Sequence, residues 1–67
     1  MTIGEAMKKA RREKGYSQPK LAMKSGLLVQ NISVWETGRA FPNIINLIPI
    51  ADALGITLDE LVGRSGR

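Results

Sequence analysis

Residues 18–38 read QPKLAMKSGLLVQNISVWETG, and the fold can be inferred outward from these residues. It predicts two short helices on either side of Gly26, which supplies the positive φ that a tight turn between helices requires. Ala22 is small at the point where the two helices must approach each other closely. The first helix follows the cap Ser17 and the second spans Val29 to Thr37, so the stretch has the form of a helix-turn-helix.

Capping signals outside this stretch predict three further helices. Thr2 with Glu5, and Thr57 with Glu60, have the spacing of capping boxes, so helices are expected from residue 3 to about residue 14 and from residue 58 to residue 62. Between them, apolar residues recur at helical spacing at positions 47, 50, 51 and 54. The sequence therefore predicts an all-α domain of five helices over residues 1–63, followed by a flexible tail at 64–67.

The start of the fourth helix depends on which asparagine caps it. If Asn43 is the cap, Pro49 falls in the second turn and removes a backbone hydrogen bond. If Asn46 is the cap, Pro49 lies in the first turn, where its missing N–H has no effect. We expect a late or kinked start.

The composition excludes most enzymes. A chain of 67 residues holds a single hydrophobic core. It has no cysteine and no histidine, which excludes disulfides, thiolate or imidazole zinc ligands, cysteine nucleophiles and a Ser-His-Asp triad. With 43% hydrophobic but only 4% aromatic residues, it has the composition of a small helical domain. We expect no enzymatic activity, no cofactor and no metal.

Positive charge is concentrated in the N-terminal part. Residues 1–40 carry eight Lys or Arg and three Glu, a net charge of +5, whereas residues 41–67 carry two Arg and three acidic residues, a net charge of −1. This asymmetry indicates that one face meets a polyanion. No segment approaches the roughly 18 apolar residues of a membrane span, and no signal peptide is apparent. We expect a cytoplasmic protein that does not bind membranes.

At this point the chain resembles the lambda-type repressor and Cro family of bacterial and phage helix-turn-helix regulators. The resemblance covers about residues 3–63 and is carried by Ser17-Gln18-Pro19-Lys20-Leu21-Ala22, Ser25-Gly26-Leu27, Ile32-Ser33, Trp35-Glu36-Thr37-Gly38-Arg39, Pro42 and Ala51-Asp52-Ala53-Leu54-Gly55-Ile56-Thr57-Leu58-Asp59-Glu60-Leu61. It implies a five-helix domain that binds double-stranded operator DNA, usually as a two-fold homodimer, and regulates transcription as a repressor.

Two sets of residues would bind the DNA. The resemblance implies contacts with backbone phosphates, which position a domain without reading sequence, from Gln18, Lys20, Thr37, Gly38, Arg39 and Asn43. Base reading is expected from the outward residues of the second helix of the motif, with the amide of Gln30 suited to adenine, the hydroxyl of Ser33 to several bases and valines to thymine methyl groups. The expected base-reading set is Val29, Gln30, Asn31, Ser33 and Val34.

One departure from the family pattern leaves a second function open. Similar proteins usually have a Ser or Thr cap where this chain has Leu28, followed by Val29, so the cap is missing and apolar side chains are expected on the reading face. Either the helix reads DNA rich in methyl groups, which we favour, or this face contacts a protein. In the second case the chain is a protein-interaction module such as an antitoxin or anti-repressor.

Two structural features complete these expectations. Arg11 and Glu36 match a pair that forms an ion pair beneath the motif in similar proteins, and Trp35 is expected in the core. The dimer surface is expected at the fifth helix and at exposed apolar residues of the C-terminal third, namely Ile45, Ile48, Leu58 and Val62. A two-fold dimer would place the base-reading helices about 34 Å apart.

Overall fold

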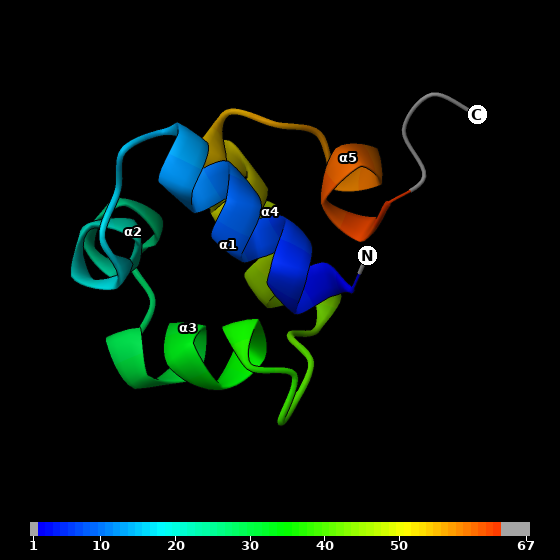
Figure 1. The fold of residues 1–67 in the computed structure, drawn as a ribbon, viewed down its shortest axis with the longest axis horizontal. Helices are drawn as coiled ribbons and strands as arrows, with labels where there is room; N and C mark the ends of the chain where they lie inside the picture. The colour runs from blue at the N-terminus through cyan, green and yellow to red at the C-terminus, as the bar shows by residue number, and fades with distance from the viewer. Residues whose placement is uncertain (1, 64–67) are drawn as a thin grey trace.

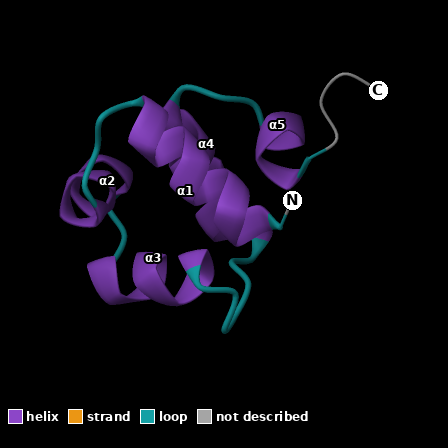
Figure 2. Cartoon of the chain, viewed as in Figure 1, coloured by secondary structure: helices purple, strands orange, loops and turns teal. Residues whose placement is uncertain are grey.

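The helices lie close to the capping signals. The computed structural model describes residues 2–63, which form α1 (Ile3–Glu13), α2 (Gln18–Ser25), α3 (Val29–Glu36), α4 (Ile44–Leu54) and α5 (Leu58–Val62), as Figures 1 and 2 show. The predicted all-α fold of five helices, with the helix-turn-helix at α2 and α3, is confirmed. The tail predicted at residues 64–67 lies outside the described residues.

The helix ends follow from local hydrogen bonding. Both capping boxes form, because the hydroxyls of Thr2 and Thr57 accept from backbone amides three residues on, and the carboxylates of Glu5 and Glu60 accept from the cap amides. Gly26 ends α2 with a φ of 74°, as the turn requires. These signals lie within single helical turns, which is why the sequence alone predicts them.

The expected late start of α4 is wrong. Asn43 is the cap, and its side-chain oxygen accepts from the amide of Asn46 at 3.0 Å. Pro49 therefore lies inside the helix and cannot donate to the carbonyl of Ile45. The added turn contributes the side-chain cap and backbone hydrogen bonds from the amides of Asn46 and Leu47 to the carbonyl of Asn43. These bonds offset the one that Pro49 cannot make.

Each helix contributes a fully buried side chain to one core. These side chains, in helix order, are Met7, Leu21, Ile32, Ile50 and Leu61. The predicted core position of the single tryptophan is confirmed, since 7% of its surface is exposed. A chain this short depends on such shared packing, because the core of a small domain contributes only a few kcal/mol of net stability.

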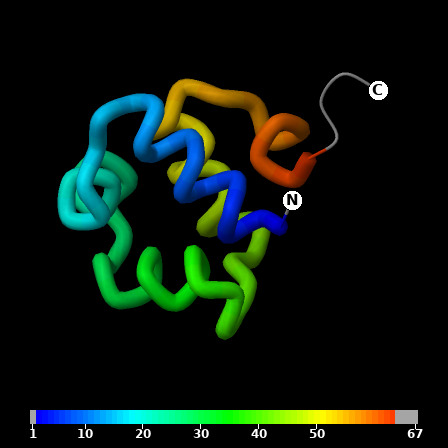
Figure 3. The backbone as a smooth tube through the Cα atoms, viewed as in Figure 1, coloured from blue at the N-terminus to red at the C-terminus, as the bar shows by residue number. Residues whose placement is uncertain are grey.

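The packing leaves α3 at the edge of the molecule. α1 packs against α3 and α5, and α2 packs against α3 and α4. Figure 1 shows α3 along the lower edge, with α1 running between it and α5. The loop of residues 37–43 leads from the end of α3 to the first turn of α4, a path that Figure 3 traces. α3 therefore has a surface that no other helix covers.

None of the helices within residues 2–63 has the length and hydrophobicity needed to cross a membrane.

Candidate nucleic-acid interface

The uncovered surface of α3 is widest over its first turn. Val29, Gln30 and Asn31 are exposed, whereas Ser33 and Val34 are half-buried. Val34 also packs against the hydrophobic core. The face that α3 offers to a groove therefore consists mainly of residues 29–31. Val34, expected to read bases along one side of α3, lies partly turned toward the protein interior.

The first turn of α3 lacks a side-chain cap. Leu28 occupies the cap position and makes no side-chain hydrogen bond, and 59% of its surface is exposed. Val29 beside it is 38% exposed. The predicted absence of a cap and exposure of apolar side chains are thus confirmed for these two residues. Together they form an apolar corner at the N-terminal end of α3, next to the amide of Gln30.

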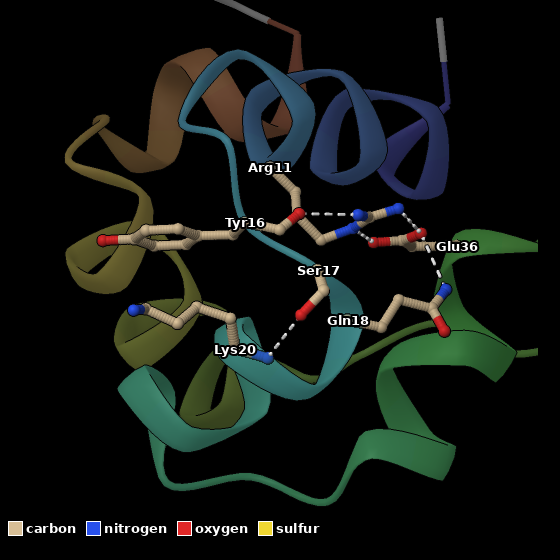
Figure 4. A network of polar contacts seen from close by, with 6 residues as sticks. All are labelled: Arg11, Tyr16, Ser17, Gln18, Lys20 and Glu36. Carbon is tan, nitrogen blue, oxygen red and sulfur yellow. Dashed lines mark hydrogen bonds and ion pairs between the residues drawn. The ribbon is translucent and has the colours of Figure 1, made fainter.

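A buried ion pair fixes the other end of α3 to α1. The guanidinium of Arg11 contacts the carboxylate of Glu36 through two hydrogen bonds, Nε to Oε2 at 2.7 Å and Nη2 to Oε1 at 3.0 Å. Arg11 also donates from Nη1 to the carbonyl of Tyr16 at 2.8 Å (Figure 4). Both charged residues are only 8% exposed. The geometry is the paired, fully hydrogen-bonded form in which a buried charge is tolerated.

Gln18 joins the same network, which the sequence did not reveal. Its Nε2 donates to Oε1 of Glu36 at 3.0 Å, as Figure 4 shows. Gln18 is half-buried in the first turn of α2, so its side chain is held against α3 rather than free in solvent. Because an amide nitrogen carries two hydrogens, the second remains available for a phosphate. Gln18 thus links the start of α2 to the end of α3.

The other residues expected at phosphates lie at the ends of helices. Lys20 is exposed in the first turn of α2, with its Nζ 5.8 Å from the centroid of the Tyr16 ring. Thr37 and Gly38 end α3, with a φ of 80° at Gly38, and Arg39, which follows them, is exposed. The side-chain oxygen of Asn43 is used in capping α4, which leaves its NH2 group. These residues are exposed, but they come from three separate segments.

Apolar side chains gather at the start of α4, in a surface that we name the α4 patch. It consists of Phe41, Ile44, Ile45 and Ile48, which are between 48% and 75% exposed. Phe41 and Ile44 were not predicted to be there. Leu58 and Val62, also expected at the dimer surface, are half-buried and pack against the core, so they are less exposed than Ile45 and Ile48, and the dimer surface stays a prediction. In a helix as short as α5, most apolar side chains face the core because few turns are available to hold it.

The described residues contain no group of three or more acidic side chains that could hold a metal ion.

The comparisons with known proteins agree with this geometry. The family model described as helix-turn-helix matches residues 7–61. An uncharacterised HTH-type transcriptional regulator, y4dJ of Sinorhizobium fredii, is 40% identical over 60 residues, which are 90% of this chain and 78% of that protein. The cryptic phage CTXphi transcriptional repressor RstR of Vibrio cholerae is 36% identical over 64 residues, 96% of this chain and 57% of that protein.

A solved structure with the same fold contains DNA. The P22 c2 repressor in complex with a synthetic operator superposes with a TM-score of 0.88, at 28% sequence identity, over 97% of this chain and 98% of that one. The chain therefore spans nearly the whole of that domain, but only a little over half of a repressor such as RstR.

Proposed function

This chain belongs to the helix-turn-helix family and is a DNA-binding transcriptional regulator, and we propose that it reads double-stranded operator DNA with α3 in the major groove and represses transcription. One observation carries the proposal. The exposed first turn of α3 presents an amide beside apolar side chains, at the edge of a domain whose other exposed helix ends carry cations and amides. We propose no catalytic activity.

The chemistry and exposure of the side chains on α3 indicate which bases each of them can contact. Gln30 and Asn31 carry amides that can bond bidentately to adenine in the major groove, and Val29 can contact the methyl group of thymine. Ser33 lies half-buried farther along α3 and Val34 is turned toward the core, so both contribute less to the reading surface. The proposed operator is accordingly rich in A·T pairs where the first turn of α3 lies.

The phosphate contacts proposed for Gln18, Lys20, Thr37, Gly38, Arg39 and Asn43 supply affinity rather than specificity. Cations and amides that contact phosphates displace condensed counterions, so binding weakens steeply as salt rises. The ion pair of Arg11 with Glu36 has a positioning role, because it fixes α3 relative to α1 and, through Gln18, relative to α2. Two copies bind as a homodimer on an operator with two half-sites.

The proposal is tested by fluorescence anisotropy with random duplex DNA at several salt concentrations. We expect affinity to fall steeply with salt, and Arg39→Ala to weaken binding at every salt concentration and lower the salt slope by about one. The matched control is Lys9→Ala, which also removes one positive charge. Lys9 pairs with Glu13 on α1 and lines a hollow against α5, away from the proposed contacts.

Specificity is tested on a site selected from a random DNA pool. Gln30→Ala should keep its affinity for random DNA and lose about 1–3 kcal/mol of discrimination at one base pair of the selected site. Absence of binding to any duplex at low salt would contradict the proposal. It would instead favour the protein-interaction module, with the exposed corner at Leu28 and Val29 as the place where a partner docks.

A further inference from the structure

We propose that the apolar corner lets this regulator distinguish methylated from unmethylated cytosine in its operator, with Leu28 as the side chain that contacts the methyl group. The inference rests on the proposed function, because it requires α3 to lie in the major groove. It adds a base, 5-methylcytosine, to those that α3 can accept. It also adds a form of regulation, since methylating the operator would raise its affinity for the protein.

Leu28 lies at the end of α3 that meets the bases in a helix-turn-helix. In this motif the N-terminal residues of the second helix contact the base edges. Leu28 is the cap residue of α3, with an extended backbone at a φ of −82° and a ψ of 138°. Its side chain is open to solvent, as are Val29, Gln30 and Asn31 after it, along the edge of the molecule in Figure 1. Leu28 is thus continuous with the proposed reading face, although the base-reading set predicted from the sequence does not include it.

The leucine has no structural task at this position. A side chain with an oxygen atom is the favoured cap, because it accepts a hydrogen bond from an amide of the first turn. Leu28 makes no such bond. The preceding Leu27 packs against the hydrophobic core, whereas Leu28 is 59% exposed and lies outside the core cluster. Its apolar surface leaves water only when a ligand covers it.

A methyl group is the apolar feature that the major groove offers to such a side chain. Among the four bases only thymine carries one, at carbon 5 of its ring. Methylation of cytosine at carbon 5 places a methyl group at the same position. Residues 25–35 contain no charged side chain, so attraction to phosphates does not compete with contact to the bases here. Covering a methyl group with Leu28 removes apolar surface of both partners from water, which is favourable.

The corner can accept 5-methylcytosine as well as thymine. Beside the methyl group, thymine presents a carbonyl oxygen, whereas cytosine presents an amino group. Leu28 has no polar atom and cannot tell these two groups apart. The neighbouring amide of Gln30 has both an acceptor and donors, so it can pair with either group. Unmethylated cytosine alone leaves the leucine without a partner.

The test is a selection from two random duplex pools that differ only in whether every cytosine is 5-methylcytosine. From the methylated pool, the wild-type protein should recover sites with 5-methylcytosine at a position that is thymine in sites from the other pool. On duplexes of one such site, removing the methyl group should lower affinity about fourfold, the value for burying one such group. Leu28→Ala should bind the methylated and unmethylated duplexes with nearly equal affinity.

The control variants separate Leu28 from other apolar side chains. Met23→Ala shortens a side chain on α2 that is 68% exposed and outside α3, and it should keep the fourfold difference. Val29→Ala should keep most of it. Circular dichroism checks that each variant is folded, which we expect because none of the three side chains is buried.

The outcomes distinguish this inference from the proposed function. Equal affinity of the wild-type protein for the methylated and unmethylated duplexes would overturn the inference and leave operator binding intact. A methyl effect that persists in Leu28→Ala, or that Met23→Ala also abolishes, would overturn the role assigned to Leu28. Absence of binding to any duplex would overturn both proposals.

Discussion

The backbone of Gly4 lies so close to the carbonyl oxygen of Trp35 that no side chain fits between α1 and α3 at this point. A Cβ built on Gly4 would overlap that oxygen and lie 2.9 Å from the carbonyl oxygen of Glu36. Glycine inside a helix is less favourable than alanine by about 1 kcal/mol. That cost is offset here, because the close approach brings α1 to the end of α3, where Glu36 meets Arg11.

We expect Gly4→Ala to destabilise the domain, although alanine is the better helix former. The new methyl group meets backbone, which cannot rotate away, so α1 must shift and the overpacking should lower the free energy of unfolding by a net ~1–2 kcal/mol. Thermal unfolding followed by circular dichroism measures this. Lys8→Ala, an exposed change on the same helix, is the control. An unchanged or raised Tm in Gly4→Ala would show that the contact is not tight.

The sequence predicts those parts of the fold that depend on one or two helical turns. Both capping boxes and the glycine ends of α2 and α5 have their signal within a few residues. Gly4 could not be singled out, because its contact with Trp35 exists only after α1 and α3 have packed. The choice between Asn43 and Asn46 as the cap failed for a similar reason. Both offer the same side chain, and whether the first turn of α4 can form ahead of Pro49 and pack on the domain is a property of the fold.

The candidate site, too, could be predicted from the sequence only in part. A resemblance indicated Arg11 and Glu36 as partners, and the structure brings them together at 2.7 Å. The third member, Gln18, was expected only at a phosphate, because no spacing rule connects residues 18 positions apart. The exposure of individual side chains was harder still to predict. The periodicity of an eight-residue helix does not show that Val34 leans on the core, and nothing in a loop shows that Phe41 points into solvent.

Removing one member of the buried ion pair should be far more harmful than removing both. Arg11→Met leaves the Glu36 carboxylate buried without its cation, and we expect a loss of about 3–5 kcal/mol in the free energy of unfolding, measured in urea. Arg11→Met combined with Glu36→Leu should recover part of that loss. A loss in the double variant equal to the sum of the losses in Arg11→Met and Glu36→Leu alone would show that the two side chains are not coupled.

A lysine at position 11 should not provide the stability that the wild-type arginine provides. The guanidinium spans Glu36 and the carbonyl of Tyr16 with three donors at once, and an ammonium group cannot reproduce that planar arrangement. We expect Arg11→Lys to unfold at a lower urea concentration than the wild type and to retain more stability than Arg11→Met, because it keeps the charge. A midpoint equal to the wild type would contradict the role assigned to the three hydrogen bonds.

The capping box at α1 makes a small pH-dependent contribution to stability. The backbone amide of Thr2 donates to the carboxylate of Glu5 at 2.9 Å, and this hydrogen bond lowers the pKa of Glu5 below its ordinary value. A carboxyl with a depressed folded pKa stabilises the fold above its unfolded pKa and loses that contribution as pH falls through the folded value. Glu5→Ala should therefore be less stable than the wild type at neutral pH, with the difference vanishing in acid. A difference independent of pH would show that the charge of Glu5 is not involved.

Leu28→Ser should raise stability and lower affinity for the operator in the same protein. Serine at the cap position can accept the free amides of the first turn of α3, and we expect a gain of about 0.5–2 kcal/mol in the free energy of unfolding. The exposed leucine would be lost from the apolar corner, so contact with thymine methyl groups should weaken.

Replacing thymine by uracil at the contacted positions removes the methyl group alone. This replacement should lower the DNA affinity of the wild-type protein more than that of Leu28→Ser. The methyl group of 5-methylcytosine lies at the same place in the major groove as the methyl group of thymine. Methylating a cytosine that lies at the apolar corner should therefore strengthen wild-type binding. If the two proteins respond alike to uracil, Leu28 does not contact the bases, and its exposure must be explained by a protein partner.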